Sequence, residues 1–353
     1  MRLKSMFLLG VISSFICITA VTPLLAYTPG KSQQGVYPVF AYSSKTGLLL
    51  GAMYLNQSPK WKSNSILILS QKYGKMLFSD IHDIPLEKLN PQLTLEASLK
   101  LYDWKDGYFQ CGDTSLNKIT KSCEELLVDN TQYNIITGPR YWISDSLSTS
   151  FQLNYNQRSE NETQEIPRQF NDEKNMGFEF DLKYDTRDDH LSAKSGIYAQ
   201  NKFLLYPSFL RTGDTMLLQW LVDTRYYYKY QKHNIASRLY LAQTLSKTET
   251  VDYFISRLRL GSQNELRGED INRYMGRAIT LIQSEYRYQF FKKLRGVLFL
   301  ELGQAGDTIG FANLITTKGL GLHYSMKHNV IVRLEMGFAK HTKNFIFSFN
   351  TAF

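Results

Sequence analysis

The sequence predicts an all-β fold, a transmembrane antiparallel β-barrel of about sixteen strands. The first reason is that apolar and polar residues alternate with a period of two in segment after segment, as in a strand with two different faces. In the segment GFEFDLKYD, the side chains of Phe178, Phe180 and Leu182 face one way. Those of Glu179 and Asp181 face the other way. After residue 26 no run of eighteen apolar residues occurs, so no transmembrane helix is expected.

A soluble β-sandwich would show the same alternation, but three features favour a membrane barrel. An N-terminal signal peptide directs the chain out of the cytoplasm. Aromatic residues make up 14% of the sequence, with 23 tyrosines, and they gather near strand ends as in an aromatic girdle. The connections alternate in length, as do the turns and loops on the two sides of a membrane barrel.

The alternating segments and their connections define the expected strands. Turns after even-numbered strands are often short and polar, whereas long connections follow many odd-numbered strands, at 104–129, 159–175, 247–277 and 305–315. This arrangement predicts a bacterial outer-membrane protein with both termini in the periplasm. The sixteen expected strands are 37–42, 47–56, 63–72, 76–86, 91–103, 130–143, 147–158, 176–186, 196–206, 213–230, 234–246, 278–290, 296–304, 316–325, 329–339 and 344–353.

The N-terminus has the composition of a secretory signal peptide. Arg2 and Lys4 precede an apolar stretch, and Ala26 provides a small residue before a cleavage site. The alternative, a membrane-anchor helix, needs a longer apolar run followed by a basic cluster. We therefore expect residues 1–26 to be removed and residues 27–353 to form a single barrel domain.

The C-terminal segment NFIFSFNTAF carries aromatic residues at alternate positions. Phe345, Phe347, Phe349 and Phe353 are expected to share one face of the last strand. Such a segment resembles the terminal recognition signal of bacterial outer-membrane barrels, in which aromatic residues lie at the membrane interface.

Composition and motifs exclude several functions. The formal net charge is +9, but the basic residues are spread along the chain, so we expect no nucleic-acid partner. The sequence contains no metal-binding, nucleotide-binding or hydrolase motif, so no metal, cofactor or catalytic residue is expected. The histidines are expected in turns and at strand ends. His82 and His323 remain candidates for a serine–histidine site built across strands. Membrane lipid is the expected surrounding of a monomeric barrel.

Two cysteines, Cys111 and Cys123, lie in the long connection 104–129. A pair close in sequence on an exported loop predicts a disulfide. Free thiols and a metal pair are the alternatives, although no histidine lies nearby to complete a zinc site.

The longest irregular connection, 247–277, contains the segment NELRGED. A loop of this length in a compact protein is usually functional or disordered. Together with SEYRYQF and GVLFLELGQAGD, it resembles the last third of the BamA/TamA superfamily of bacterial surface-antigen barrels, which insert or translocate proteins at the outer membrane. The segments YDTRDDHLSAKSGIYAQ and YDWKDGYFQCGD agree with that resemblance. It implies that the loop between strands eleven and twelve folds into the barrel.

Elementary chemistry gives this loop a reason to fold inward. Glu285 and Glu301 lie on the polar faces of neighbouring expected strands, as does Arg287. A carboxylate in a confined interior needs a partner. Arg267 supplies a planar, bidentate one, and Gly268 lets the backbone turn tightly and pass close to the wall. We therefore expect the loop to be pinned to the barrel, the alternative being a solvent-exposed Arg267.

The sequence departs from the superfamily in two ways. Glu269 replaces the usual aromatic residue after Arg-Gly, and it is expected to pair with Arg267, Arg273 or Arg277. About ten residues, 27–36, precede the first expected strand, so the chain resembles a barrel-only branch without POTRA domains.

Three functions remain open. The first is non-covalent insertion or translocation of proteins, in which the seam between the first and last strands opens and lends its edge to a client strand, an unfolded outer-membrane protein. The second is a passive channel or surface antigen that acts with a separate periplasmic partner. The third is a lipid-modifying enzyme, which no motif supports.

Overall fold

The structure is a computed structural model. It describes residues 33–43, 47–57, 62–70, 72–110, 124–160, 172–190, 192–213, 215–246, 255, 257–326, 331–349 and 352–353. The predicted signal peptide and both loop cysteines, Cys111 and Cys123, lie outside these residues. In the described part of the chain, no helix is long and apolar enough to cross a membrane.

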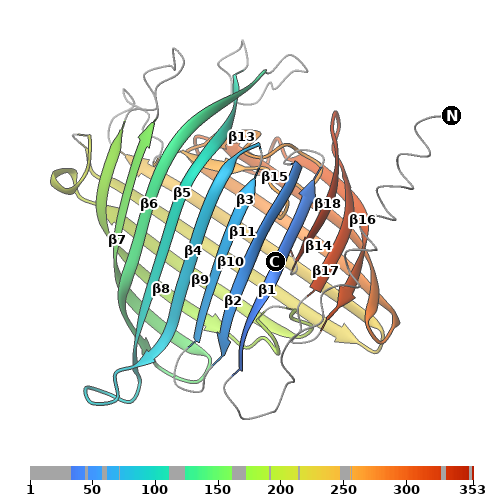
Figure 1. The fold of residues 1–353 in the computed structure, drawn as a ribbon, viewed down its shortest axis with the longest axis horizontal. Coiled ribbons are helices and arrows are strands. Elements are labelled where there is room, and N and C mark those ends of the chain that lie inside the picture. The colour runs from blue at the N-terminus through green and yellow to red at the C-terminus, as the bar shows by residue number, and fades with distance from the viewer. Residues whose placement is uncertain are drawn as a thin grey trace.

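The chain forms a closed antiparallel barrel of sixteen strands, which confirms the predicted fold class (Figure 1). Each of the sixteen expected segments corresponds to one barrel strand. Two further short strands, β12 (Leu258–Leu260) and β13 (Tyr274–Gly276), pair with each other in the connection between β11 and β14. The barrel strands are β1 (Gln33–Ser43), β2 (Gly47–Gln57), β3 (Lys62–Ser70), β4 (Gly74–Pro85), β5 (Leu93–Gln110), β6 (Glu124–Trp142), β7 (Leu147–Glu160), β8 (Glu173–Asp185), β9 (Gly196–Tyr206), β10 (Leu217–Tyr230), β11 (His233–Ser246), β14 (Ala278–Phe291), β15 (Leu294–Gly306), β16 (Ile315–Ser325), β17 (Ile331–Phe338) and β18 (Lys343–Phe349).

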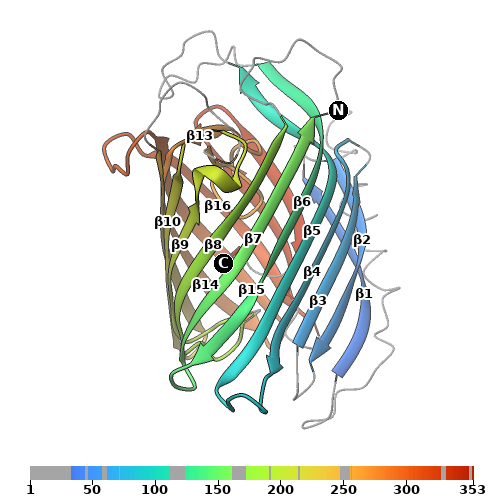
Figure 2. The ribbon, with the colours of Figure 1, turned by 90° about the vertical axis from the view of Figure 1, so that its left-hand side faces the viewer.

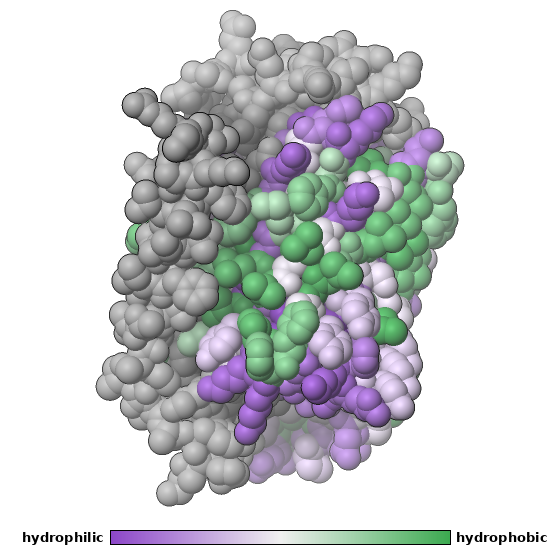
Figure 3. Space-filling model, turned by 90° about the vertical axis from the view of Figure 1, so that its right-hand side faces the viewer, coloured by the Kyte–Doolittle hydropathy of each residue, from purple (hydrophilic) through white to green (hydrophobic). Residues whose placement is uncertain are grey.

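The period-two alternation separates a lipid-facing surface from a polar interior. In β15, Leu298 is 57% exposed, whereas Glu301 on the opposite face is fully buried. Figure 3 shows the result on one side of the barrel, where an apolar band lies between hydrophilic residues. A membrane barrel needs such an outward apolar band.

Strands β5 and β6 are longer than the sequence predicts, and they reach beyond their neighbours at one end of the barrel (Figure 1). They remain paired as far as Gln110 and Glu124. The prediction of a loop over 104–129 is therefore wrong for both ends of that segment. Apolar alternation marks only the part of a strand that faces lipid. The backbone hydrogen bonds between β5 and β6 continue beyond that part.

In the described part of the chain, the seam that closes the barrel is short. Among the described residues, β1 and β18 share two register pairs, Tyr42 with Phe347 and Ser43 with Ile346. By contrast, β1 pairs with β2 along its whole length, from Gln33 to Ser43. Within the described chain, the rest of β1 therefore presents an edge without a β18 partner.

The two described residues after β18, 352–353, are buried inside the barrel. Phe345 and Phe347 lie on the outer side of β18, and the Tyr42 and Phe345 ring centroids are 6.2 Å apart. Phe353 does not continue that face. It is buried with Ala352 against Ala193, Tyr227 and Ala236. The prediction that Phe353 shares the outer face is wrong, because β18 ends at Phe349 and its alternation does not extend to the last residues.

Candidate functional site

The guanidinium of Arg267 lies at the centre of a buried charge cluster. This residue belongs to the segment between β12 and β13, and its side chain is fully buried. Its Nη1 is 2.7 Å from Oε1 of Glu285 and 2.9 Å from Oε1 of Glu335, and its Nε donates to Oε1 of Glu301 at 2.8 Å. The three glutamates lie on β14, β17 and β15, so one side chain connects three barrel strands.

Glu301 is surrounded by hydrogen-bond donors. Its Oε2 accepts from the backbone N–H of Arg267 at 2.6 Å and from the hydroxyl of Thr317 at 2.9 Å. Its Oε1 accepts from the amide of Gln283 at 2.7 Å. The ring of Phe299 lies below the cation, with its centroid 3.6 Å from Cζ of Arg267. Both carboxylate oxygens of Glu301 therefore have hydrogen-bond partners, and these partners fix the orientation of the side chain.

Glu335 is the part of the cluster that the sequence did not single out. Its Oε1 is also 2.8 Å from Nε2 of His323, and its Oε2 accepts from Nη1 of Arg333 at 3.2 Å. Arg333 also donates to the backbone oxygen of Gln263 at 3.0 Å and to the side-chain oxygen of Asn264. His323 lies near the end of β16, as expected of the histidines, but it is fully buried at this cluster.

Two glycines allow the loop backbone to touch the wall. A Cβ atom at Gly268 would lie 2.6 Å from the carbonyl carbon of Phe338 and 2.7 Å from the nitrogen of Ala339. A Cβ atom at Gly337 would lie 2.6 Å from the oxygen of Arg267. The hydroxyl of Thr342 then donates to the oxygen of Gly268 at 2.7 Å. The loop is thus attached to the β17–β18 hairpin by main-chain contact.

Gly268→Ala is expected to destabilise the barrel by about 1–3 kcal/mol, because an added methyl group must displace backbone atoms in a packed contact. Urea unfolding in detergent micelles, followed by tryptophan fluorescence, measures this loss. Gly310→Ala is the matched control, since its Cβ would meet only the Gln304 side chain, at 3.4 Å. Equal stability of the two variants would show that the backbone contact at Gly268 contributes nothing.

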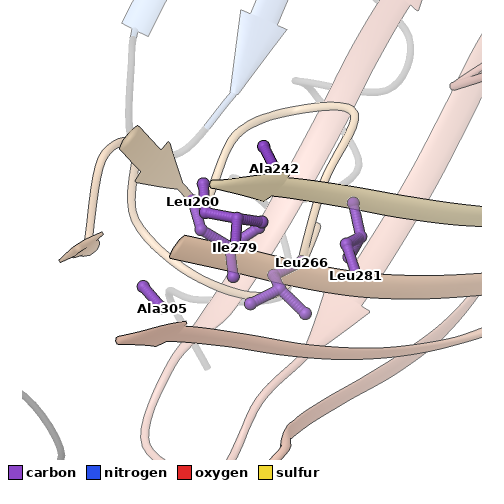
Figure 4. Packing of buried hydrophobic residues seen from close by; sticks show 6 residues of the cluster. All are labelled: Ala242, Leu260, Leu266, Ile279, Leu281 and Ala305. Carbon is purple, nitrogen blue, oxygen red and sulfur yellow. The ribbon is translucent and has the colours of Figure 1, made fainter. Parts of the chain in front are cut away.

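Apolar side chains complete the attachment (Figure 4). Leu260 and Leu266 from the loop are buried in one cluster with wall residues of β11, β14 and β15. Leu266 has a φ of +47°, a left-handed conformation that a branched residue adopts only when its surroundings enforce it. The wall residues are Ala242, Ile279, Leu281 and Ala305.

Glu269 has different partners from those predicted. Its Oε1 accepts from the hydroxyl of Tyr274 at 3.0 Å, and its Oε2 accepts from that of Thr342 at 3.0 Å. Arg273 pairs with Asp270 at 3.0 Å. The carboxylate of Glu269 therefore fixes the loop to the β17–β18 hairpin and to β13.

Arg287 extends the cluster toward the opposite end of the barrel. Its Nη2 is 2.6 Å from Oε2 of Glu285, and its Nη1 donates to the backbone oxygen of Ala193 at 3.3 Å. Ala193 belongs to the connection between β8 and β9. The cluster thus reaches from the loop at one end to this connection at the other.

The structure brings together all five predicted residues of the cluster, namely Arg267, Gly268, Glu285, Glu301 and Arg287. It adds Glu335, His323, Arg333, Phe299 and Gly337. The alternation of IVRLEMGF places Arg333 and Glu335 on the polar face, so the sequence carried a signal for them. In the described part of the chain, no group of histidine, cysteine, aspartate and glutamate residues could hold a metal ion.

Solved structures of other proteins share the fold of this chain. No protein-family model and no curated protein sequence matches the chain. BamA from Haemophilus ducreyi lacking POTRA domains 1-3 superposes with a TM-score of 0.62 at 11% identity, covering 90% of this chain and 70% of that one. CdiB from Acinetobacter baumannii gives a TM-score of 0.60 at 15% identity, covering 94% of this chain and 64% of its own. CdiB from Escherichia coli gives a TM-score of 0.63 at 11% identity, covering 92% of this chain and 63% of its own.

The chain therefore spans less than two thirds of the length of either CdiB protein. At these identities the similarity establishes the architecture, a sixteen-stranded barrel resembling that of BamA, and the resemblance predicted from the sequence is confirmed for the fold.

Proposed function

We propose that this chain is an outer-membrane barrel that facilitates the insertion or translocation of other proteins without covalent chemistry. The observation that carries the proposal is the short seam. Beyond Tyr42 and Ser43, the described part of β1 has no register partner in β18. An unpaired strand edge is a template for pairing with an incoming strand. A client strand would add to the β1 edge and so enter the membrane with its backbone hydrogen bonds satisfied.

The charge cluster supplies the rigidity that such a seam needs. Arg267 connects β14, β15 and β17, and Thr342 ties the β17–β18 hairpin to the loop. The wall is therefore cross-linked from inside between the second strand from the seam, β17, and the fifth, β14. A barrel that opens at one junction keeps its shape only if the remaining wall is held together.

A polar cavity favours a second candidate, a passive channel. A cavity of about 380 Å³ lies between loop residues 255 and 257–259 and the inner faces of β5, β6, β7, β9 and β10. Its lining includes Lys100, Asn134 and Asn154, together with Arg257 and Arg259. Amide and cationic groups suit the passage of small polar solutes. On this reading a separate periplasmic partner supplies any protein-assembly role.

An insertion assay tests the proposal. The protein is refolded into liposomes, a urea-unfolded small outer-membrane barrel is added, and its folding is followed by gel shift. We expect faster folding than in empty liposomes, and we expect Arg267→Ala to lose that acceleration. Folding at the rate of empty liposomes by the wild-type protein would contradict the proposal and favour the channel.

A further inference from the structure

The interior of the barrel holds a second pocket, which shares Arg287 with the Arg267 cluster. Ala193 from the β8–β9 connection, Tyr227 from β10 and Ala236 from β11 enclose Phe353. Arg287 of β14 covers the ring, with its Cζ 5.9 Å from the ring centroid. Four elements that lie far from residue 353 in the sequence thus converge on its aromatic side chain.

The walls of this pocket are joined to one another without help from residues 352–353. Asn234 donates to the backbone oxygen of Lys194 at 2.7 Å, and Arg287 donates to that of Ala193 at 3.3 Å. Arg295 donates to the hydroxyl of Ser192 at 3.2 Å. The β8–β9 connection is therefore fixed to the inner wall by its own hydrogen bonds. A pocket built this way is preorganised, which lowers the entropy lost on binding.

The chemistry of the pocket selects an aromatic side chain. Two alanines leave room where larger residues would fill the space. The Tyr227 ring lies 6.5 Å from the Phe353 ring, tilted by 37°, which is a favourable aromatic arrangement. A guanidinium near the ring face adds a cation–π attraction. An aliphatic side chain would use the space but would gain neither of these interactions.

Phe353, the residue that fills the pocket, follows β18, which forms the seam with β1. Residues 352–353 lie outside any strand, and they follow β18. Among the described residues, β18 is held to β1 by the two pairs at Tyr42 and Ser43. A client strand that paired along the whole of β1, including Tyr42 and Ser43, would displace β18 from these two residues, so the position of the occupant and the state of the seam are linked.

We infer that this pocket is a binding site for an aromatic side chain on an extended peptide segment, and that Phe353 is its resident occupant. The ligand class is a strand end with aromatic residues at alternate positions, like residues 343–353 themselves. The inference rests on the proposed function in one respect, because it identifies this ligand with the end of a client strand.

Peptide binding to the full-length protein in detergent micelles tests the inference without any insertion activity. The probe is a fluorescent peptide of residues 344–353, and its anisotropy is measured. We expect Phe353→Ala, which vacates the pocket, to bind the probe at least about tenfold more tightly than wild type, in which Phe353 competes. The same peptide with its final phenylalanine replaced by alanine is expected to bind no better to the variant than to wild type.

A blocked pocket provides the control. In the Phe353→Ala background, Ala236→Trp fills the pocket and is expected to abolish the gain. Ser237→Trp, one residue away on the outer face of β11, is expected to keep it. Equal binding to both tryptophan variants would place the peptide elsewhere and overturn the inference. Absence of any gain in Phe353→Ala would also overturn it. If that variant is unfolded, Phe353→Leu replaces it, and a smaller gain is expected because leucine occupies part of the space without the two ring interactions. Either result leaves the insertion assay unaffected.

Discussion

Arg267→Ala is expected to destabilise the barrel by about 3–5 kcal/mol, the usual loss when one partner of a buried ion pair is removed. Glu285, Glu301 and Glu335 are fully buried, and each loses the same guanidinium. His323, Arg287 and Arg333 remain, but none of them replaces the three contacts of a central cation. Urea unfolding in detergent micelles measures the loss, with the four tryptophans of the chain as the fluorescence signal.

Two comparisons separate this effect from the loss of an arginine in general. Arg225→Ala removes a guanidinium from Asp223, but Asp223 keeps two hydrogen bonds from Arg238, at 3.0 Å each, so a smaller loss is expected. Arg267→Lys is expected to recover part of the stability, because an ammonium supplies the charge without the planar set of donors. If Arg267→Ala and Arg225→Ala were equally stable, the loop would not be pinned by its cation.

A double-mutant cycle shows whether the cluster acts as a unit. Glu335→Gln is expected to be harmful in the wild-type background, because it weakens the contacts with Arg267 and Arg333. It is expected to be less harmful, or favourable, together with Arg267→Ala, because it then removes an uncompensated charge. Additive losses would indicate that the residues contribute independently.

The sequence was sufficient for the fold because the membrane imposes a simple rule. A strand that faces lipid on one side and a polar interior on the other must alternate, and each of the sixteen strands shows that pattern somewhere along its length. Alternation is required only in the part of each strand that faces lipid. The ends of β5 and β6, at Gln110 and Glu124, therefore carried no periodic signal, although backbone pairing extends that far.

The charge cluster was predictable in part, and the reason lies in barrel geometry. Alternation places Glu285, Glu301 and Glu335 on inner faces, but it does not say which of them are level with one another. That depends on the stagger between neighbouring strands, which no single strand contains. The resemblance to the BamA/TamA superfamily pointed to Glu285 and Glu301. Glu335 and His323 could be placed only from the register of β16 and β17.

The position of Phe353 is a case in which alternation gives the wrong prediction. It has the same parity as Phe345 and Phe347, so alternation alone places it on the outer face. The place at which β18 ends and the chain turns inward depends on the pocket formed by Ala193, Tyr227 and Ala236. Because these residues lie far from Phe353 in the sequence, only the folded chain brings them to it.

The seam provides the second large effect, since covalent closure should abolish assisted folding. Tyr42 and Phe347 are register partners across the seam. Antiparallel partners have Cα atoms about 4.5–5.5 Å apart, within the range that a disulfide spans. In a chain without its native cysteines, oxidised Tyr42→Cys/Phe347→Cys is expected to fold a client barrel no faster than empty liposomes. Reduction is expected to restore the rate.

The matched control places the same cross-link one junction away. Met336 and Phe345 are register partners between β17 and β18, which need not separate when the seam opens. Oxidised Met336→Cys/Phe345→Cys should therefore keep its activity, although it also carries a disulfide on β18. Loss of activity in both variants would indicate general stiffening of the barrel. Full activity of the oxidised seam variant would show that clients do not need the β1 edge, and the polar cavity would then be the better guide to function.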